Sequence, residues 1–363
     1  MNMNFHMPVE LLSGVDCVKA HAARFAPLGK RALLVTSRHA AKACGALQDV
    51  VSALEAQGIA YTLYDAMEQN PRLDTCYTGG QAGRDADFVI GIGGGSALDG
   101  AKAVAAFAAN PDIPPMALYD ALPRKPLPLV AIPTTAGTGS EANPYAVITL
   151  PEAGVKKTFK TPDVYPVFAL IDPKYTLTLS RDFTVSTALD ALCHCIESYL
   201  SPKSTVASEV FALRGARLVW EGLARVESGD LGLETRETLL YGSTCGGLAI
   251  NTTGTGFPHP MGYNLTLSYG LPHGAACAVF AGEYLTRSEQ AAPDRVQALY
   301  AAMGADGPAV KALMDRLCGY HEPVSEADVQ RFVPLLASAG NWSNAFFTVT
   351  EAEMAEMYRR IGR

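Results

Sequence analysis

Four residues in the second half of the chain have the types and spacing of a divalent-metal site: Asp190, His194, His259 and His273. Asp190 and His194 stand four apart in the segment TALDALCHCIESYL, so a helix would present both side chains on one face. His259 and His273 follow in GTGFPHPMGYNLTLSYGLPHGAACAVF, each flanked by Pro or Gly. Three imidazoles and one carboxylate are typical ligands of Fe²⁺ or Zn²⁺ rather than of Mg²⁺ or Ca²⁺.

The cysteines beside His194 suggest a second metal hypothesis. Cys193 and Cys195 bracket this histidine and could indicate a thiolate site. On a helix, however, both would point away from the Asp190 and His194 face, so we expect buried thiols instead. The eight cysteines of the chain are scattered without the rhythm of a disulfide-rich domain, which favours a reduced, cytoplasmic protein.

A glycine-rich turn in the first half is a candidate phosphate-binding loop. The segment DFVIGIGGGSALDGAKAVAAF reads as a strand that ends in Gly93, Gly94, Gly95 and Ser96 and opens directly into a helix. Glycines let the backbone approach a pyrophosphate, and a helix N-terminus offers unpaired N–H groups. The segment matches neither G-x-G-x-x-G nor a Walker loop, so a tight turn that binds nothing is the alternative.

A second loop strengthens the nucleotide hypothesis. The segment AIPTTAGTGSEANPYAVIT places Thr134, Thr135, Thr138 and Ser140 immediately after another strand. Hydroxyl groups at the carboxyl end of a strand suit ligand binding in an open α/β sheet. Such a turn is structural in many proteins, so its weight comes from its pairing with the glycine turn. Two such loops on one sheet edge indicate a large phosphorylated ligand.

The end of the first clear strand, LLVTSRHAAK, helps to choose that ligand. In nucleotide-binding sheets an acidic residue here would bind the ribose hydroxyls and repel a 2′-phosphate. This chain has Ser37 instead, followed by Arg38, His39 and Lys42. The sequence therefore favours NADP(H) over NAD(H), unless Arg38 and Lys42 are simply solvated helix residues.

The elements that must position these residues divide the chain in two. Continuous apolar runs at 31–36, 60–65, 87–96, 126–135 and 168–173 alternate with helical patterns, which is typical of a doubly wound parallel sheet. From about residue 181, long Ala/Leu/Glu-rich segments follow one another. We therefore predict an α/β dinucleotide-binding domain over 1–180 and a helical metal-binding, catalytic domain over 181–363.

Composition limits the possible partners. The 363 residues carry a net charge of −7, which argues against binding nucleic acid or anionic membrane surfaces. The N-terminal segment MNMNFHMPVELLSG does not resemble a signal peptide, and no apolar run is long enough to span a bilayer.

Four motifs in order, GGGSALDGAK, PTTAGTGSE, DALCHCIESYLS and the two-histidine segment ending GLPHG, resemble those of the iron-dependent (group III) alcohol dehydrogenase family. The resemblance covers essentially the whole chain, and TGFPHPMGYNLT is most similar to the branch of the 1,3-propanediol dehydrogenases. It implies a dehydroquinate-synthase-like architecture, with a Rossmann-like α/β N-terminal domain and an all-α C-terminal domain.

The resemblance also implies roles for individual residues. The metal, Fe²⁺ with Zn²⁺ or another divalent ion as alternatives, would be held by the four residues named first. NAD(P) would lie across the interdomain cleft, and the expected protein is a homodimer. The positions that match the family's cofactor-binding pattern are Gly94, Gly95, Ser96, Asp99, Lys102, Thr134, Thr135, Thr138 and Lys157.

Tyr263 departs from the family pattern. Many members carry a further histidine at this position, four residues beyond the third metal ligand, where it is thought to relay a proton. A tyrosine hydroxyl can pass a proton, but with an ordinary pKa near 10 it is a poor base at neutral pH. Tyr263 is therefore expected either to take part in catalysis or only to shape the substrate pocket.

The expected activity is metal-dependent, NAD(P)-linked oxidation of a small primary alcohol or diol, or reduction of an aldehyde. The metal would act as a Lewis acid on the substrate oxygen, and the nicotinamide would carry the hydride. A dehydroquinate-synthase-like lyase and a glycerol-dehydrogenase-like or maleylacetate-reductase-like enzyme are the alternatives of the same fold. A non-catalytic nucleotide-binding protein is the alternative from another class.

Overall fold

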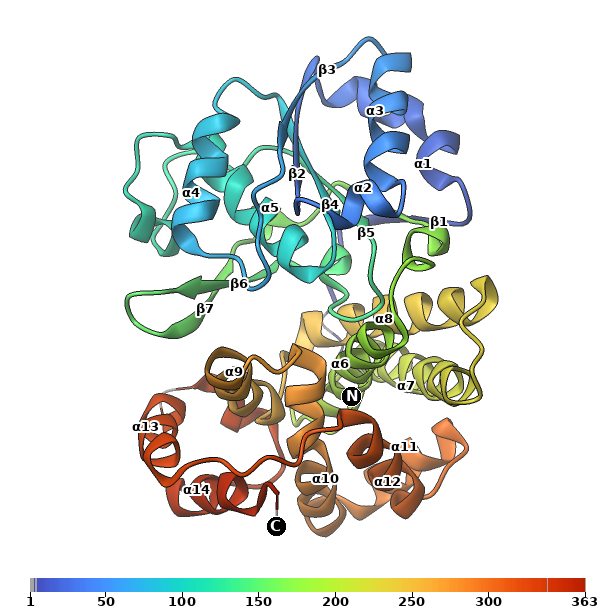
Figure 1. The fold of residues 1–363 in the computed structure, drawn as a ribbon, viewed down its shortest axis with the longest axis vertical. Helices are drawn as coiled ribbons and strands as arrows, with labels where there is room; N and C mark the ends of the chain where they lie inside the picture. The colour runs from blue at the N-terminus through green and yellow to red at the C-terminus, as the bar shows by residue number, and fades with distance from the viewer. Residues whose placement is uncertain (1–2, 4, 338, 363) are drawn as a thin grey trace. The chain divides into compact units, whose positions relative to one another are not determined.

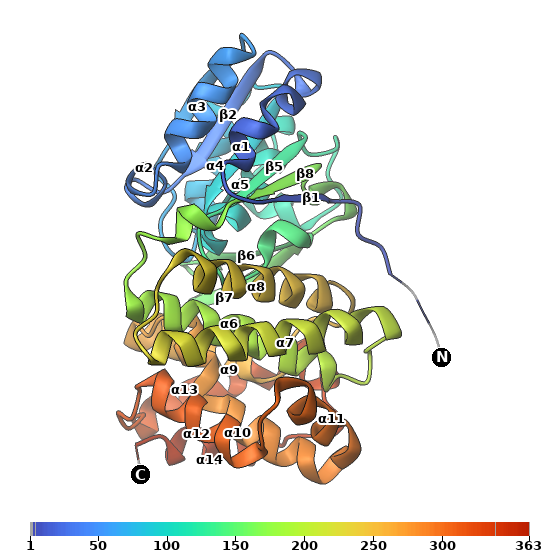
Figure 2. The same cartoon turned by 90° about the vertical axis from the view of Figure 1, so that its right-hand side faces the viewer.

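The computed structural model describes residues 3, 5–337 and 339–362, arranged in two compact units (Figures 1 and 2). The first unit comprises His6–Leu179 and Leu231–Leu240. The second comprises Ser180–Asp230 and Tyr241–Arg363, together with the N-terminal residues up to Phe5, whose ring stacks on Phe211. The division expected at residue 180 falls next to this boundary, but the return of Leu231–Leu240 to the first unit was not indicated by the sequence pattern.

The first unit is built on a six-stranded parallel sheet in the order β1-β8-β5-β4-β2-β3. Alternate residues of its central strands are buried on opposite faces: Leu34 and Ile90 belong to one core cluster, Leu33 and Val89 to the other. Burial on both faces explains the continuous apolar runs of the sequence. The strands are β1 (Glu10–Ser13), β2 (Arg31–Thr36), β3 (Ala60–Tyr64), β4 (Phe88–Gly93), β5 (Leu129–Pro133) and β8 (Phe168–Ile171).

Helices cover both faces of this sheet, as Figure 1 shows. One cluster is closed by α3 (Ala46–Ala56), and the other by α4 (Leu73–Ala82) and α5 (Gly95–Ala109). The predicted α/β fold is thereby confirmed. The shorter helices of the unit are α1 (Cys17–Ala20), α2 (Ala40–Ala43), η1 (Ala22–Leu28), η2 (Pro115–Tyr119), η3 (Ser140–Ala142), η4 (Pro162–Val164) and η5 (Pro173–Thr176).

The strand order reverses between β2 and β4, because β3 lies beyond β2 while β5 and β8 lie beyond β4. Ligands of open α/β sheets bind outside the carboxyl ends of the strands at such a reversal. The residues that follow these two ends are Ser37 after β2 and Gly94 after β4. The topology therefore brings the two sequence signals for a nucleotide to the same edge of the sheet.

Three strands of this unit were not predicted. One is β1 at the sheet edge, and the others are β6 (Tyr145–Leu150) and β7 (Val155–Lys160), which form an antiparallel hairpin. The hairpin region was interpreted as loop because its strands are only partly buried and mix basic and apolar residues. Such short strands lack the continuous apolar run that marked the central sheet.

The second unit is helical, as predicted, and no strand occurs among its described residues. Ser180 caps the central helix α6 by accepting a hydrogen bond from the Phe183 N–H. None of the described helices has the length and apolarity needed to cross a membrane. Helix α8 (Leu233–Thr253) begins in the first unit and enters the second at Tyr241. The other helices are α6 (Arg181–Tyr199), α7 (Val206–Glu227), α9 (Pro258–Tyr269), α10 (His273–Ala291), α11 (Pro293–Met303), α12 (Gly307–Cys318), α13 (Glu326–Ala337), η6 (Gly340–Asn344) and α14 (Glu351–Arg360).

Candidate functional site

Three helices of the second unit bring the four candidate metal ligands together. Asp190 and His194 lie on α6, His259 lies in the first turn of α9, and His273 begins α10. The Nε2 atoms of His194, His259 and His273 stand 3.8, 3.5 and 3.6 Å from one oxygen, Asp190 Oδ1. Four ligands held about 2.1 Å from one ion in a tetrahedral arrangement lie roughly 3.4 Å apart. The spacing of these donor atoms therefore suits a transition-metal ion.

Two of the donor atoms have no hydrogen-bond partner among the described residues, although both are buried. These are Asp190 Oδ1 and His259 Nε2, on side chains that are 4% and 3% exposed. A buried polar atom without a partner costs free energy, so such atoms are rare unless an ion or water completes them. The pair is consistent with a cation between them.

The electrostatics of the site also favour a cation. Burial by itself would raise the pKa of the Asp190 carboxyl, but the surrounding imidazoles outweigh burial and hold that pKa well below its usual range. Burial would lower the pKa of His259, but the carboxylates of Glu197 and Asp190 raise it to about 10. The carboxylates of Glu197 and Asp190 thus favour a positive charge at this place.

Glu197 is a further residue of the candidate site that the sequence analysis missed. Its two carboxylate oxygens lie 2.9 and 2.8 Å from His259 Nδ1, and Oε2 also accepts a hydrogen bond from the Gly256 N–H at 2.6 Å. Burial raises the pKa of this carboxyl, although the His259 ring opposes the shift. Glu197 stands seven residues after Asp190 on α6, and that helical spacing could have revealed it.

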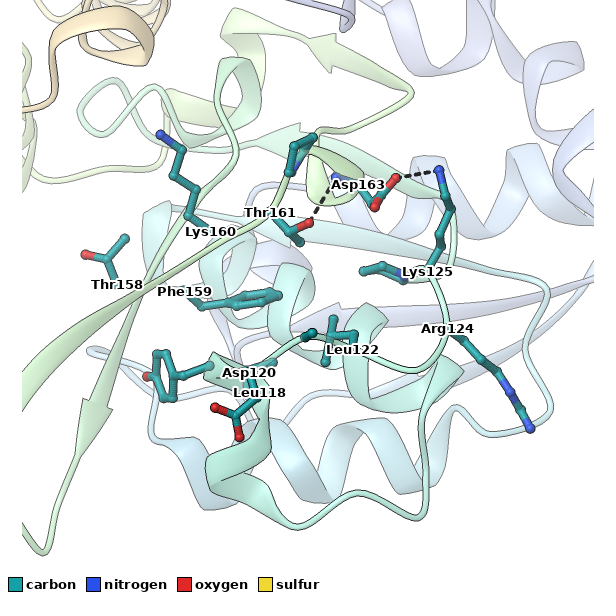
Figure 3. A pocket seen from close by; sticks show the side chains of 14 residues that line it. Leu118, Asp120, Leu122, Arg124, Lys125, Thr158, Phe159, Lys160, Thr161 and Asp163 are labelled. Carbon is teal, nitrogen blue, oxygen red and sulfur yellow. Dashed lines mark hydrogen bonds and ion pairs between the residues drawn. The ribbon is translucent and has the colours of Figure 1, made fainter.

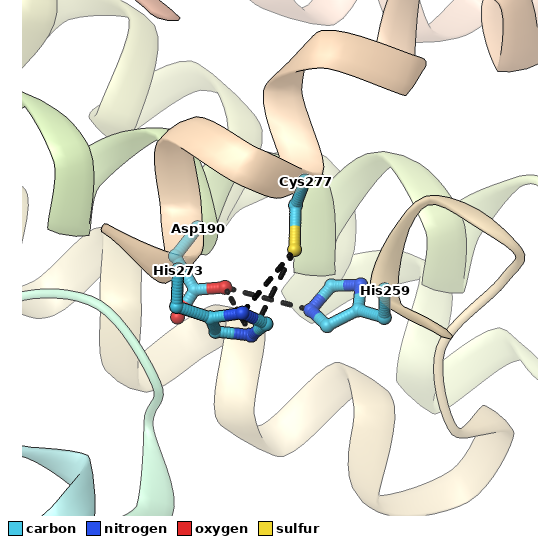
Figure 4. A group of neighbouring side chains, drawn as sticks. All are labelled: Asp190, His259, His273 and Cys277. Atoms are coloured by element: carbon cyan, nitrogen blue, oxygen red, sulfur yellow. Dashed lines mark hydrogen bonds and ion pairs between the residues drawn. The ribbon is translucent and has the colours of Figure 1, made fainter. Parts of the chain in front are cut away.

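Cys277 also joins the cluster, as Figure 4 shows. Asp190, His259, His273 and Cys277 each offer one donor atom, and these four atoms lie within 4.8 Å of one another. Cys277 Sγ lies 3.7 Å from both ring nitrogens of His273, one helical turn away on α10. The expectation for Cys193 and Cys195 is confirmed, because both are buried thiols.

Tyr263 lies on the more accessible side of the cluster. Its ring stacks on that of His273, with centroids 5.3 Å apart. The His273 side chain is 25% exposed, whereas those of His194 and His259 are 6% and 3% exposed. His273, beside Tyr263, is therefore the most exposed of the three histidines of the cluster.

In the first unit, the glycine turn and the threonine loop are in direct contact. A β-carbon on Gly94 would stand 2.9 Å from Thr135 Cγ2, and one on Gly95 would stand 2.3 Å from Thr138 Cγ2. Both glycines and both threonines stay partly exposed, whereas Thr134 is buried. The predicted loops thus form one surface, with Thr135 and Thr138 in its accessible part.

Asp99 and Lys102 lie beneath this surface. Lys102 is fully buried, and its Nζ donates to Ser140 Oγ at 2.6 Å and to the Tyr145 carbonyl at 2.6 Å. Asp99 accepts hydrogen bonds from Ser140 Oγ and from the Val147 N–H. Burial lowers the pKa of Lys102 to about 8, although Asp99 opposes the shift. These two residues join α5 to the threonine loop and to β6.

The alternation of β7 separates Lys157 from the glycine turn. Lys157 Nζ lies 4.1 Å from the centre of the Tyr119 ring. On the other face of the strand, Lys156 Nζ lies 2.9 Å from Asn70 Oδ1, and the Asn70 N–H donates to Ser96 Oγ at 3.1 Å. Lys156, which the sequence analysis did not single out, is thus linked to the glycine turn through one residue.

Ser37 follows β2 and is partly buried, while Arg38 and His39 are exposed. Lys42 forms an ion pair with Asp65 at 2.7 Å, and this contact lowers the pKa of the Asp65 carboxyl. One of the three basic neighbours of Ser37 is therefore already paired, which leaves Arg38 and His39 as the exposed ones.

A separate cavity of about 380 Å³ lies in the first unit between η2 and β7 (Figure 3). At its rim Lys125 pairs with Asp163 at 2.9 Å, and Lys160 Nζ lies 3.2 Å from the Tyr145 hydroxyl. Lys125, Asp163 and Lys160 are thus engaged with protein partners, and the sequence analysis placed no candidate residue in this cavity.

Comparison with known proteins agrees with this arrangement. The model of the family "Iron-containing alcohol dehydrogenase" matches residues 8–173, and that of the C-terminal part of the Fe-containing alcohol dehydrogenase family matches residues 184–327. The NAD-dependent methanol dehydrogenase of Bacillus methanolicus is 30% identical over 76% of this chain and 73% of its own length. The 1,3-propanediol dehydrogenase of Klebsiella pneumoniae is 32% identical over 69% of this chain, and the match spans 66% of that relative's own length.

Solved structures match over the full length. The crystal structure of an iron-containing alcohol dehydrogenase from Thermotoga maritima superimposes with a TM-score of 0.93 at 33% sequence identity, and the match covers 100% of both chains. The predicted two-domain fold is therefore confirmed for the chain as a whole.

Proposed function

The chain belongs to the iron-containing alcohol dehydrogenase family, and on that premise we propose that it is a metal-dependent, NAD(P)-linked dehydrogenase of small primary alcohols or diols. The reverse reaction would reduce the corresponding aldehydes. The observation that carries the proposal is the convergence of three imidazole nitrogens within 3.8 Å of Asp190 Oδ1.

Asp190, His194, His259 and His273 would hold the metal, and the buried Asp190 Oδ1 and His259 Nε2, which have no hydrogen-bond partner among the described residues, fit it. A bound divalent ion supplies Lewis acidity toward an alcohol or aldehyde oxygen, and a bound nicotinamide exchanges the hydride. The donor set admits both iron and zinc. We propose Fe²⁺ because the family is described as iron-containing.

The residues of this chain would act mainly by positioning and by excluding water. Glu197 orients His259, and burial of Asp190 and His259 removes competing solvent from the ligand atoms. Tyr263 stacks on the most exposed ligand, His273, so it would contact a substrate that approaches from that side. Its hydroxyl would shape the pocket or pass a proton to solvent.

For the cofactor we propose NADP(H) rather than NAD(H). The support is Ser37 at the end of β2, where a carboxylate would favour NAD, together with exposed Arg38 beside it. The dinucleotide phosphates would lie on Gly94, Gly95 and Ser96, with Thr135 and Thr138 alongside. We also propose Lys157, Asp99 and Thr134 as cofactor-binding residues, on the sequence pattern alone. Lys156 is added because it contacts Asn70, which contacts the glycine turn.

The assembly and location follow the same premise. We propose a homodimer of a cytoplasmic enzyme whose cysteines are reduced; the described cysteines are all free. A lyase acting on a phosphorylated, carboxylated substrate is disfavoured, because residues 259–273 contain no Lys or Arg.

The test is turnover of NADPH and NADH with a panel of short aldehydes and diol-derived aldehydes after anaerobic reconstitution with Fe²⁺ or Zn²⁺. Metal-dependent oxidation of the nicotinamide would support the proposal. Absence of turnover by a protein that has been shown to bind both metal and nucleotide would reject it in favour of the lyase or the non-catalytic alternative.

A further inference from the structure

Glu197 is placed so that it acts on the metal centre without being able to touch the ion. Both of its carboxylate oxygens face His259 Nδ1, at 2.9 and 2.8 Å, on the side of the ring away from Asp190. The opposite ring nitrogen, Nε2, lies 3.5 Å from Asp190 Oδ1. The carboxylate, the imidazole and the candidate metal position thus form a series in which each contacts only the next.

We propose that Glu197 is a positioning residue of the metal centre, which keeps the Nδ1 of His259 protonated and its Nε2 free to bind the ion. The inference rests on the proposed metal centre. A histidine that donates its second ring N–H to a carboxylate is fixed in one tautomer and one orientation, and it becomes a stronger ligand.

The same carboxylate also fixes the loop that leads into α9. Gly256 N–H donates to Glu197 Oε2 at 2.6 Å. The carbonyl of the preceding Thr255 accepts hydrogen bonds from the side chains of Asn341 and Asn344, at 3.1 and 2.8 Å. The loop is therefore held by two sets of hydrogen bonds, and Glu197, which makes one of them, also contacts the candidate metal ligand His259.

Burial makes this arrangement sensitive to single atoms. The Glu197 and His259 side chains are 1% and 3% exposed, so water cannot replace a lost contact cheaply. An amide at position 197 keeps the size of the side chain but has only one acceptor oxygen. Both carboxylate oxygens lie within 2.9 Å of His259 Nδ1, so in either orientation of the amide its NH₂ group would face the Nδ1–H, donor against donor.

The experiment compares Glu197→Gln with Ser198→Ala, the next buried residue of α6, whose hydroxyl contacts Thr253 at 2.9 Å. The affinity of each metal-free protein for Co²⁺ is measured by competition with a chelator, and the visible Co²⁺ spectrum is recorded, without alcohol or nucleotide. We expect Glu197→Gln to weaken binding about 10- to 100-fold and to change the spectrum. Ser198→Ala should stay within about twofold of the parent protein in Co²⁺ affinity, because the Ser198 hydroxyl contacts Thr253 and not a candidate metal ligand.

A double-variant cycle with His259→Ala separates positioning from general support of the fold. If Glu197 acts through His259, Glu197→Gln should lower Co²⁺ affinity much less in the His259→Ala background than in the parent. Parent-like affinity and spectrum in Glu197→Gln, or equal losses in both backgrounds, would overturn the proposal. Should Glu197→Gln fail to fold by circular dichroism, Glu197→Asp, which keeps the charge but shortens the reach, takes its place with the same criteria.

These measurements involve neither alcohol nor nicotinamide. A failure of the Glu197 proposal can therefore be distinguished from a failure of the proposed dehydrogenase function. A protein that binds Co²⁺ as expected but does not turn over aldehydes would reject the dehydrogenase assignment and leave the role of Glu197 intact. A parent protein that binds no divalent ion would reject both.

Discussion

Thr138 packs against Gly95 so closely that a β-carbon on the glycine would stand 2.3 Å from Thr138 Cγ2 and 2.8 Å from Thr138 Oγ1. Real β-carbons essentially never lie closer than 3.0 Å to such an atom, so no side chain fits at position 95 while the threonine loop keeps its place. The glycine is thus required by the neighbouring loop, in addition to any ligand that it approaches.

Gly95→Ala is expected to displace the threonine loop and to weaken nucleotide binding at least about tenfold, or about 1.4 kcal/mol. The reason is that the added methyl must push Thr138 away from the position where it faces the ligand surface. Fluorescence titration with NADPH measures the effect, and the Co²⁺ affinity of the second unit should be unchanged.

The matched control for this change is Gly282→Ala. Gly282 lies inside α10, and a β-carbon there would meet nothing within 4 Å. Alanine in a helix interior is more stable than glycine by about 0.5–1 kcal/mol, so this variant should bind NADPH normally and unfold at a slightly higher temperature. Equal nucleotide affinity in both variants would contradict the packing argument.

His273→Ala is expected to abolish metal-dependent alcohol oxidation while leaving the nucleotide loops intact. Loss of an outer contact alone typically costs 10- to 100-fold, so removal of a ligand should lower turnover by at least about 100-fold. Metal content after dialysis, turnover and NADPH affinity are measured on the same preparation. Full activity in this variant would refute the metal mechanism.

Ser37→Asp is expected to shift cofactor preference from NADP(H) toward NAD(H). A carboxylate at the end of β2 would accept hydrogen bonds from the ribose hydroxyls and repel a 2′-phosphate. The ratio of kcat/KM for NADPH to that for NADH should fall at least about tenfold, which corresponds to about 1.4 kcal/mol. Ser37→Ala, which adds no charge, is the control and should change the ratio less. A parent enzyme that already prefers NADH would show that Ser37 does not select the 2′-phosphate.

Glu353 gives a prediction for pH. Hydrogen bonds from the Thr350 backbone and the Arg287 side chain lower the pKa of its carboxyl to about 2, from an ordinary value of 4.5. Because the pKa is depressed in the folded state, its stabilising contribution is present above pH 4.5 and is lost as the pH falls toward 2. Glu353→Gln keeps an acceptor for the capping box but removes the charge, so it should lower stability at pH 7 by up to about 1 kcal/mol, the usual range for an exposed ion pair. Denaturant unfolding of parent and variant should converge between pH 4.5 and 2, and a constant difference over that window would contradict the assignment.

The sequence predicted the elements that carry strong local signals. The buried strands β2, β4 and β5 were marked by continuous apolar runs, and Asp190 and His194 by a helical spacing that any later packing preserves. The contact between the glycine turn and the threonine loop could be expected because both follow parallel strands of one sheet. These predictions depend on short-range periodicity, which the sequence displays directly.

Features that depend on register or on distant contacts could not be predicted in the same way. Whether Lys156 or Lys157 turns toward the glycine turn is decided by the pairing of β7 with β6, and an error of one residue reverses the faces. The link from Glu197 to His259 joins residues 62 apart in the chain. Its helical spacing from Asp190 was visible, but the packing of α9 against α6 was not.

Lys102 ties three segments together from the inside, and this has a consequence for how a dinucleotide would bind. Its hydrogen bonds to Ser140 and Tyr145 lie within the protein, so the threonine loop and the start of β6 are held in place without a ligand. The conformational entropy lost in ordering these segments is part of the cost of folding, so it does not reduce the affinity for the ligand. Binding of a dinucleotide therefore needs little further ordering of these segments, and this preorganisation favours its affinity.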